Sequence, residues 1–454
     1  MPKNSLVIKN GRVIDPASKT DDKLDILIEG DEIKAITRRE IEDRKQKAEN
    51  RIPKTEYRKP IVIDAKGYIV VPGLIDVHTH LREPGEAHKE TIHSGTMAAA
   101  AGGFTTIICQ PNTNPRIDTP ERVRAIKERI KKDSIVRLYP SACITTDHRQ
   151  LVDINGVKDA GAIKLTDDGD PVIYEEIMQQ VLREAKKIGI VVSPHCELSP
   201  WAESELKIQN PKSKIQSSKD KVQLKTQMEP IFIKRDIEIA KKLNAPIFIS
   251  HVSMAESVEL IAQAKKEGVP VTCEVTPHHL VLTNDDIAHY GPAESRFVGI
   301  CYNTNAKVNP PLRSQQDTLA LIEALSNGTI DVIASDHAPH GVKSNDWEEA
   351  EFGMIGLETT IGIVLNSLVA TKKMSLIDVI SKLTINPARI FNLCAGALKV
   401  GSPADITIID LNQEWVVDVN KFKSKSRNSP FQGWKLKGKV VMTIVGGKII
   451  YPSS

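Results

Sequence analysis

The pattern of apolar and polar positions divides the chain into three parts. Near the N-terminus, apolar and polar residues alternate in SLVIKNGRVID, DILIEGDEIKAI and PIVIDAKGYIVVPG, with Gly and Asp between the runs, as is typical of β-strands joined by turns. The same pattern returns after about residue 390 in GALKVGSPADITIID, QEWVVDV and KGKVVMTIVGGKIIY. We therefore predict that residues 1–72 and 391–454 together form one small β domain, a β-sandwich built from both chain ends.

The middle of the chain has a different pattern. Eight strand-like apolar runs alternate with helical segments, at 74–80, 104–110, 135–141, 161–166, 188–195, 245–251, 269–275 and 330–337. Continuous β-branched runs between helices indicate parallel strands that are covered on both faces. Eight such units predict an α/β fold, a (β/α)8 TIM-like barrel over residues 73–390, with its active site at the carboxyl ends of the strands.

Three polar stretches separate the apolar runs, two in the barrel segment and one near the N-terminus. The intervals 196–244 and 276–329 are longer than the others, and long insertions at barrel strand ends commonly serve as lids or substrate loops. A dense charge run, TRREIEDRKQKAENRIPKTEYRKP, lies between the early strands. We interpret it as a solvated surface segment.

Composition narrows the class of protein. The 454 residues are 40% hydrophobic, and 61 basic against 58 acidic residues give a net charge of +3, so charge gives no reason to expect nucleic acid or an anionic membrane as partner. No apolar run reaches the about 18 residues that span a bilayer, and the N-terminus lacks the apolar stretch of a signal peptide. The six cysteines form no CxxC pair, which indicates reduced thiols and a cytoplasmic protein.

Histidines gather at the predicted strand ends. His78 and His80 end the first barrel strand and, two residues apart, share one face. His195, His251 and Asp336 end the fifth, sixth and eighth strands. Four imidazoles and a carboxylate at the mouth of one barrel predict a zinc-type metal site.

The fourth strand, GAIKLTDDG, adds two candidates through its alternation. Lys164, Thr166 and Asp168 share the face that should point into the barrel, whereas Asp167 should point away. Asp168 is then a candidate metal ligand. A buried ammonium is costly unless it is paired, so Lys164 either pairs with an acid or carries a carbon dioxide adduct, whose anionic carbamate bridges two metals.

These residues belong to motifs that resemble a known family. In order along the chain the motifs are DVHTHLREPG, QPNTNP, TDDG, HCE, SHVS, EVTPHH, VNPPLR and SDHAPH. They resemble the amidohydrolase superfamily over residues 73–391, and PGLIDVH and GSPADI resemble its small β domain. Together, HLREPG, PNTNP and NPPLR are more similar to the dihydroorotase family than to the hydantoinases or allantoinases.

The resemblance implies a role for each matching residue. His78 and His80 would bind one metal together with Asp336, and His195 and His251 would bind a second, with one or two Zn²⁺ per chain. The substrate carboxylate and ring would be contacted by Arg82, Asn112, Asn309 and His340, and by backbone groups of Phe352 and Gly353. Relatives with an intact TDDG usually have a small residue in place of Lys164 and use the aspartate as bridging ligand, so we expect Asp168 to bridge, with a carbamylated Lys164 as the alternative.

The implied activity is the reversible cyclisation of N-carbamoyl-L-aspartate to (S)-dihydroorotate in pyrimidine biosynthesis. In the hydrolytic direction Asp336 would act as general base and then as general acid. Two alternatives stay open: another cyclic amidohydrolase, a hydantoinase or allantoinase, and a non-catalytic partner of aspartate carbamoyltransferase. The partners expected are a small-molecule substrate, a second copy in a homodimer and an aspartate carbamoyltransferase.

Overall fold

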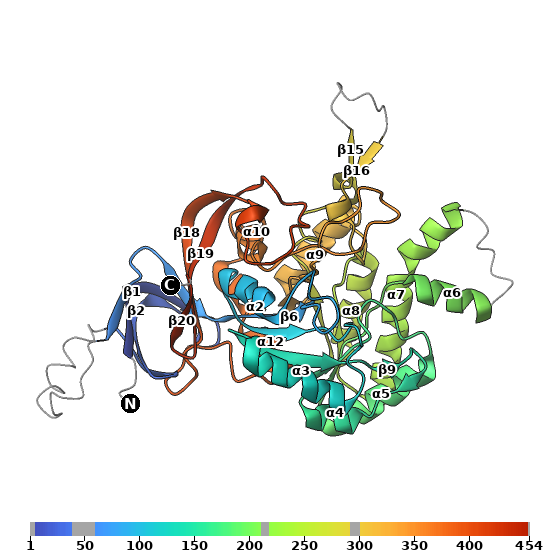
Figure 1. Cartoon of the computed structure of the whole chain (residues 1–454), viewed down its shortest axis with the longest axis horizontal. Coiled ribbons are helices and arrows are strands. Elements are labelled where there is room, and N and C mark those ends of the chain that lie inside the picture. The colour runs from blue at the N-terminus through green and yellow to red at the C-terminus, as the bar shows by residue number, and fades with distance from the viewer. Residues whose placement is uncertain (1–4, 39–59, 210–217, 291–299, 453–454) are drawn as a thin grey trace, which may run out of the picture.

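The computed structural model describes residues 5–38, 60–209, 218–290 and 300–452. Most of the charge run falls within 39–59, so its interpretation lies outside the described residues. Figure 1 shows the first strands of the chain beside its last strands, on one side of a larger body of strands and helices. The two chain ends thus build one unit and the middle of the chain builds the other.

The sheet from the chain ends has eight strands, and none of the described strands from the middle of the chain (β6–β17) enters it. Its strands are β1 (Ser5–Asp15), β2 (Thr20–Glu29), β3 (Glu32–Thr37), β4 (Ile61–Asp64), β5 (Ile69–Pro72), β18 (Ile406–Val416), β19 (Lys435–Val445) and β20 (Lys448–Tyr451). The N-terminal and C-terminal strands join where β5 pairs antiparallel with β18. β1 pairs in parallel with β4 at one end and with β5 at the other, and the separate sheet from the chain ends agrees with the predicted β-sandwich.

Apolar side chains from both chain ends fill the inside of this folded sheet. Ile8, Ile26 and Val70 from the first strands pack with Ile406 and Ile444 from the last, and all five are buried. Burying one such side chain stabilises a fold by about 1.5–3 kcal/mol. The shared core explains why segments so far apart in the sequence form one domain, whose limits at residues 72 and 391 remain a prediction.

All eight predicted barrel strands are present. They are β6 (Leu74–Thr79), β7 (Phe104–Cys109), β8 (Arg137–Ala142), β11 (Lys164–Leu165), β12 (Val191–Val192), β13 (Ile247–Ile249), β14 (Val271–Val275) and β17 (Val332–Ile333). The first five pair in parallel as one sheet and the last three as another. A parallel bridge between Thr79 and His337 and a 2.7 Å hydrogen bond between the hydroxyls of Ser193 and Ser250 close the barrel.

Helices cover the barrel. They are α2 (Ile92–Ala101), α3 (Pro120–Asp133), α4 (Ile154–Ala160), α5 (Glu175–Ile188), α6 (Pro200–Gln209), α7 (Ser218–Leu243), α8 (Ala255–Lys266), α9 (Gln315–Asn327), α10 (Thr360–Val364), the π-helical η3 (Leu365–Val369), α11 (Leu376–Lys382) and α12 (Ile385–Ile390). Among the described residues, none of the helices has both the length and the apolar character required to cross a membrane.

Short elements lie between β8 and α4, in the interval 276–329, and between β18 and β19. These are the hairpins β9–β10 (Thr145–Thr146, Gln150–Leu151) and β15–β16 (Ala288–Tyr290, Ile300–Tyr302), with the 3₁₀ turns η1 (Asn284–Asp286), η2 (Thr304–Ala306) and η4 (Val419–Lys421). The interval 196–244 consists largely of α6 and α7, and α9 ends the interval 276–329.

Local sequence signals fix the helix ends that border the site. α9 begins at a capping box, in which the Ser314 hydroxyl accepts from the Asp317 amide and Asp317 accepts from the Ser314 amide. It ends at Gly328, whose φ of +87° suits glycine. Because Ser314 is pinned in this way, the preceding NPPLR loop is fixed at its helical end.

Candidate active site

The two histidines of the HxH motif lie at the mouth of the barrel, as expected. His78 is in β6 and His80 directly follows it, and their ring centroids are 5.5 Å apart. In each ring, Nδ1 has a hydrogen-bond partner outside the histidine pair. Glu274 Oε1 lies 2.5 Å from the Nδ1 of His78, and Asn112 Oδ1 lies 3.0 Å from the Nδ1 of His80. A ring that donates from Nδ1 keeps the lone pair of Nε2 for a metal.

The second pair of histidines comes from two other strand ends. His195 follows β12 and His251 follows β13, and both are buried. His195 Nδ1 lies 2.8 Å from His251 Nε2, and Asn309 Nδ2 lies 3.1 Å from His195 Nε2. Burial, together with the charge of His251, lowers the pKa of His195 to about 3, so His195 is neutral, the form that binds metals.

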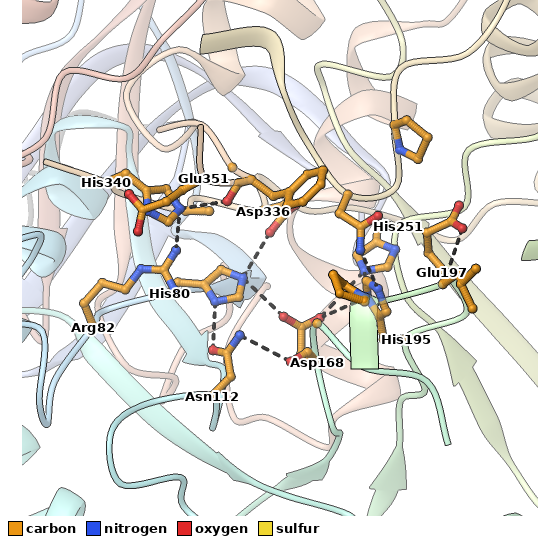
Figure 2. A pocket seen from close by; sticks show the side chains of 18 residues that line it. His80, Arg82, Asn112, Asp168, His195, Glu197, His251, Asp336, His340 and Glu351 are labelled. Atoms are coloured by element: carbon orange, nitrogen blue, oxygen red, sulfur yellow. Dashed lines mark hydrogen bonds and ion pairs between the residues drawn. The ribbon is translucent and has the colours of Figure 1, made fainter. Parts of the chain in front are cut away.

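Asp168 lies between the two pairs (Figure 2). Its Oδ1 is 3.1 Å from His78 Nε2, and its Oδ2 is 3.3 Å from His80 Nε2. On the other side, its Oδ1 is 3.8 Å from His195 Nδ1 and 3.7 Å from His251 Nε2. One carboxylate therefore belongs to two groups of ligand-type atoms, the first with His78 and His80 and the second with His195 and His251.

The alternation predicted for the fourth strand persists beyond its last paired residue. β11 ends at Leu165, yet Asp168 still faces the site. Asp167 points away, where its Oδ1 accepts from the amides of Ile144 and Thr145 at 3.1 and 3.2 Å.

Lys164 also faces inward and is fully buried. Its Nζ donates to the Val77 carbonyl at 2.8 Å. Burial lowers the pKa of the Lys164 ammonium, against the opposing charges of Glu274 and Asp168.

Asp336 follows β17 and completes the cluster. Its Oδ1 lies 3.2 Å from His80 Nε2 and 3.5 Å from His78 Nε2. Asp336, His251 and Arg82 adopt left-handed backbone conformations, with φ of 46°, 30° and 58°. Non-glycine residues rarely adopt such conformations, which concentrate at functional sites because the surrounding structure must hold them there.

The chemistry of this cluster fits a divalent cation. His78 Nε2 and Asp168 Oδ1 are buried and face each other, but neither forms a hydrogen bond within the described residues. Burial alone would lower the pKa of His78, yet the charges of Asp168, Glu274 and Asp336 raise it well above its usual value. These buried carboxylates favour the protonated, positively charged form of His78. A metal ion bound at the cluster would neutralise the same carboxylates.

A cavity of about 430 Å³ opens beside this cluster. Its size suits a small molecule. Every residue expected to contact substrate lines it, namely Arg82, Asn112, Asn309, His340, Phe352 and Gly353. The cavity also exposes His80, Asp168, His195, His251 and Asp336.

Arg82 forms the cationic wall of the cavity (Figure 2). Arg82 is only 8% exposed. Its Nε donates to the Pro339 carbonyl at 3.0 Å, and its Nη2 lies 3.1 Å from His340 Nε2. Within the described part of the chain, no carboxylate lies close enough to Arg82 to form an ion pair. Burial lowers the pKa of Arg82, and the more distant charge of Glu86 counteracts this effect.

Two functional candidates escaped the sequence reasoning. Glu274, in β14, orients His78, and its place near the end of a predicted barrel strand was the available signal. Glu197 lines the cavity and is paired with the buried Arg313 of the NPPLR motif. Burial raises the pKa of Glu197 to about 7, although Arg313 opposes the shift.

The fold and this cluster together define a class of enzyme: a (β/α)8-barrel hydrolase whose His and Asp side chains, gathered at the strand ends, suit a divalent metal. The chain belongs to the amidohydrolase family, whose model matches residues 69–450.

Individual relatives are similar over almost the whole chain. A protein named dihydroorotase from Acetivibrio thermocellus is 40% identical over 449 residues, which cover 98% of each chain. One of the same name from Ehrlichia canis is 42% identical over 450 residues, covering 97% of this chain and 94% of the relative. Among solved structures, the L-hydantoinase (dihydropyrimidinase) from Arthrobacter aurescens superposes with a TM-score of 0.81 at 26% identity, covering 99% of this chain and 96% of the other.

Proposed function

We propose that this chain is a dihydroorotase, a metal-dependent enzyme that catalyses the reversible cyclisation of N-carbamoyl-L-aspartate to (S)-dihydroorotate in de novo pyrimidine (UMP) biosynthesis. One observation carries the proposal: Arg82 is a buried cation on the wall of a small cavity, beside the histidine cluster, with no acidic partner among the described residues. Such a cation fits a substrate with a carboxylate next to a cyclic amide. The relatives named dihydroorotase support the same activity.

Arg82 would hold the substrate carboxylate. A guanidinium can pair with a carboxylate through two hydrogen bonds, which fixes the orientation of the ring as well as its position. His340 lies against Arg82 Nη2, and burial together with the charge of Arg82 lowers the pKa of His340 to about 3. A neutral His340 has one N–H, which could turn to the substrate carboxylate from its present partners, the Phe352 carbonyl at Nε2 and Glu351 at Nδ1.

The metal side of the proposal assigns the ligands in two groups. His78, His80 and Asp336 would hold one ion, and His195 and His251 the other, with Asp168 shared between them. A divalent ion held there supplies Lewis acidity, which polarises a carbonyl oxygen and makes water more acidic. We propose zinc, with one or two ions per chain, because neutral imidazoles and carboxylates are its usual ligands.

The bridging role falls to Asp168 in this proposal. Its two oxygens face both histidine pairs, which supports the assignment. Lys164 has its Nζ engaged with the Val77 carbonyl, and a carbamate there is the alternative.

Asp336 would move the proton. The nearby histidines outweigh the effect of burial and lower the pKa of Asp336 strongly, so its carboxylate is ionised at neutral pH and can accept a proton. In the hydrolytic direction an Asp336 oxygen takes the proton from the attacking water and delivers it to the amide nitrogen that leaves. In the direction of ring closure the same oxygen first takes the proton from the attacking nitrogen.

The test is a comparison of substrates with the purified, zinc-loaded protein. We expect turnover of dihydroorotate to exceed that of hydantoin and of allantoin. The likeness to the Arthrobacter hydantoinase makes a hydantoinase the second candidate, and faster turnover of hydantoin would favour it. Absence of turnover on all three would favour the non-catalytic alternative, against which the complete cluster of His and Asp counts.

Partners and location complete the proposal. Self-association into a homodimer, and binding of an aspartate carbamoyltransferase, can be tested by light scattering of the protein alone and mixed with that enzyme. A cytoplasmic location, expected from the scattered cysteines, can be tested by fractionation of the cells that make the protein.

A further inference from the structure

One side chain from the C-terminal segment reaches the wall of the cavity. β18 and β19 are antiparallel neighbours, but residues 417–434 connect them instead of a tight turn. Within this connection Asn428 is only 3% exposed. Its Nδ2 donates to the carbonyls of Ala338 and Gly353 at 3.0 and 3.1 Å, and its Oδ1 accepts from the amide of His340 at 3.0 Å.

Asn428 therefore uses both amide hydrogens and its carbonyl oxygen on residues that line the cavity. Its backbone carbonyl also accepts from the amide of Ile355 at 3.0 Å. These bonds tie the segment after β17, which carries His340, to the segment that carries Gly353. Space there is tight: a Cβ atom on Gly353 would lie 2.6 Å from Ala338 Cβ, and its φ of +130° suits glycine alone.

Two carboxylates, the buried Glu90 and the half-buried Glu358, and one apolar side chain hold the connection itself in place. Glu358 accepts from the amides of Lys423 and Ser424 at 2.8 and 3.1 Å, and Glu90 accepts from the amide of Lys425 at 3.1 Å. On the other side of Asn428, Phe431 is buried in an apolar cluster that includes Met354. The position of Asn428 is thus set by both flanks, as precise positioning of a neighbour requires.

We propose that Asn428 is a positioning residue of the substrate pocket, which holds His340 and Gly353 in the places where they contact the carboxylate and the ring of the substrate. This inference rests on the proposed dihydroorotase function. The C-terminal segment then contributes to substrate binding although it contributes no strand to the barrel. Since Asn428 acts on groups remote from the reacting bond, its loss should weaken binding more than it slows the chemical step.

The test uses the full-length, zinc-loaded protein with Asn428→Ala and Asn428→Ser, because a serine hydroxyl is too short to replace both donors. We expect KM for dihydroorotate to rise about tenfold or more, with kcat changed by less than about threefold. Asn420, exposed in the same connection, provides the control: Asn420→Ala should leave both constants unchanged. Circular dichroism and zinc content should stay at the values of the unaltered protein.

A double-mutant cycle separates positioning from general stabilisation. If Asn428 acts through His340, most of the loss caused by Asn428→Ala should disappear when His340 is already alanine. An unchanged KM in folded variants, or an undiminished loss in the His340→Ala background, would overturn the proposal. Failure of both variants to fold would also overturn it, since Asn428 would then serve stability. If the unaltered protein does not turn over dihydroorotate, the proposed function fails instead.

Discussion

Asp336 combines a lowered pKa with a position against both HxH rings, and this combination makes a specific prediction. Asp336→Asn keeps the size of the side chain but removes the proton acceptor, so kcat should fall by about 10²–10⁴-fold. Steady-state assays on dihydroorotate would measure the loss. Asp346→Asn, at an exposed position, should have no effect. A kcat within a few fold of that of the unaltered enzyme would show that another group carries the proton.

Arg82 offers a second prediction at this scale. Arg82→Ala removes the partner of the substrate carboxylate, and losing a charge-assisted hydrogen bond of about 1.5–3 kcal/mol should raise KM by about 10- to 150-fold. Arg82→Lys should recover little, because an ammonium cannot reproduce the two-pronged contact. The exposed Arg124 provides the control, Arg124→Ala. Unchanged KM in Arg82→Ala would contradict the assignment.

The bridging ligand can be decided with two variants. If Asp168 bridges, Asp168→Ala should lose bound metal while Lys164→Ala retains it, as measured by elemental analysis after gel filtration. If Lys164 is carbamylated, Lys164→Ala should lose activity and regain part of it with added short carboxylic acids. Electron density extending beyond Lys164 Nζ to two metals would contradict the preference for Asp168.

The types of residue at the site could be predicted because strand ends converge in a barrel. His78, His195, His251 and Asp336 end separate apolar runs, and the structure places them together. Glu274 could not be assigned in the same way. It is separated from His78 by 196 positions, and only the closed barrel brings the two side chains to hydrogen-bonding distance.

At the level of elements, the strands were predictable but their lengths were not. The eight runs are confirmed as barrel strands, since continuous β-branched segments suit a sheet that is covered on both faces. β11, β12 and β17 nevertheless have only two paired residues each. Beyond them the backbone leaves the sheet while side chains such as Asp168 still face the site, and an apolar pattern carries no information on where pairing stops.

The connection between β17 and α10 contains a buried lysine that makes stability depend on pH. Lys343 Nζ donates to the carbonyls of Gly353 and Lys307 at 3.0 and 3.2 Å. Burial, aided by the charge of Lys307, lowers the pKa of Lys343 from 10.5 to about 7. Between these two values the unfolded chain binds more protons than the folded chain, so this group makes the free energy of unfolding rise with pH from about 7 to about 10.

Lys343→Met should remove that dependence. The free energy of unfolding of the variant minus that of the unaltered protein should be larger at pH 6.5 than at pH 9. The reason is that the unaltered protein bears the full cost of burying a charged ammonium only at the lower pH. Melting temperatures of both proteins at the two pH values would measure the difference. An exposed lysine, Lys421, provides the matched control, Lys421→Met. A constant difference between the two pH values would contradict the prediction.

For the molecule as a whole, metal removal is the decisive perturbation. Treatment with a chelator should abolish turnover, and zinc or a similar divalent ion should restore it. The melting temperature should also fall, because the buried Asp168, Asp336 and Glu274 would lose the cation that neutralises them. Turnover and calorimetry before and after re-addition of zinc would measure both effects. Full activity in rigorously metal-free protein would contradict the metal assignment.

The joining of the chain ends has a consequence for synthesis of the protein on the ribosome. β5 is made early, but β18, with which it pairs, follows roughly 330 residues later. At about 5–20 residues per second this delay amounts to roughly 15 to 65 s. Throughout that time the edge of β5, Ile69–Pro72, lacks its partner and can attract strands from other nascent chains. Shielding of that edge until the last strands have been translated would therefore protect the nascent chain from wrong pairing.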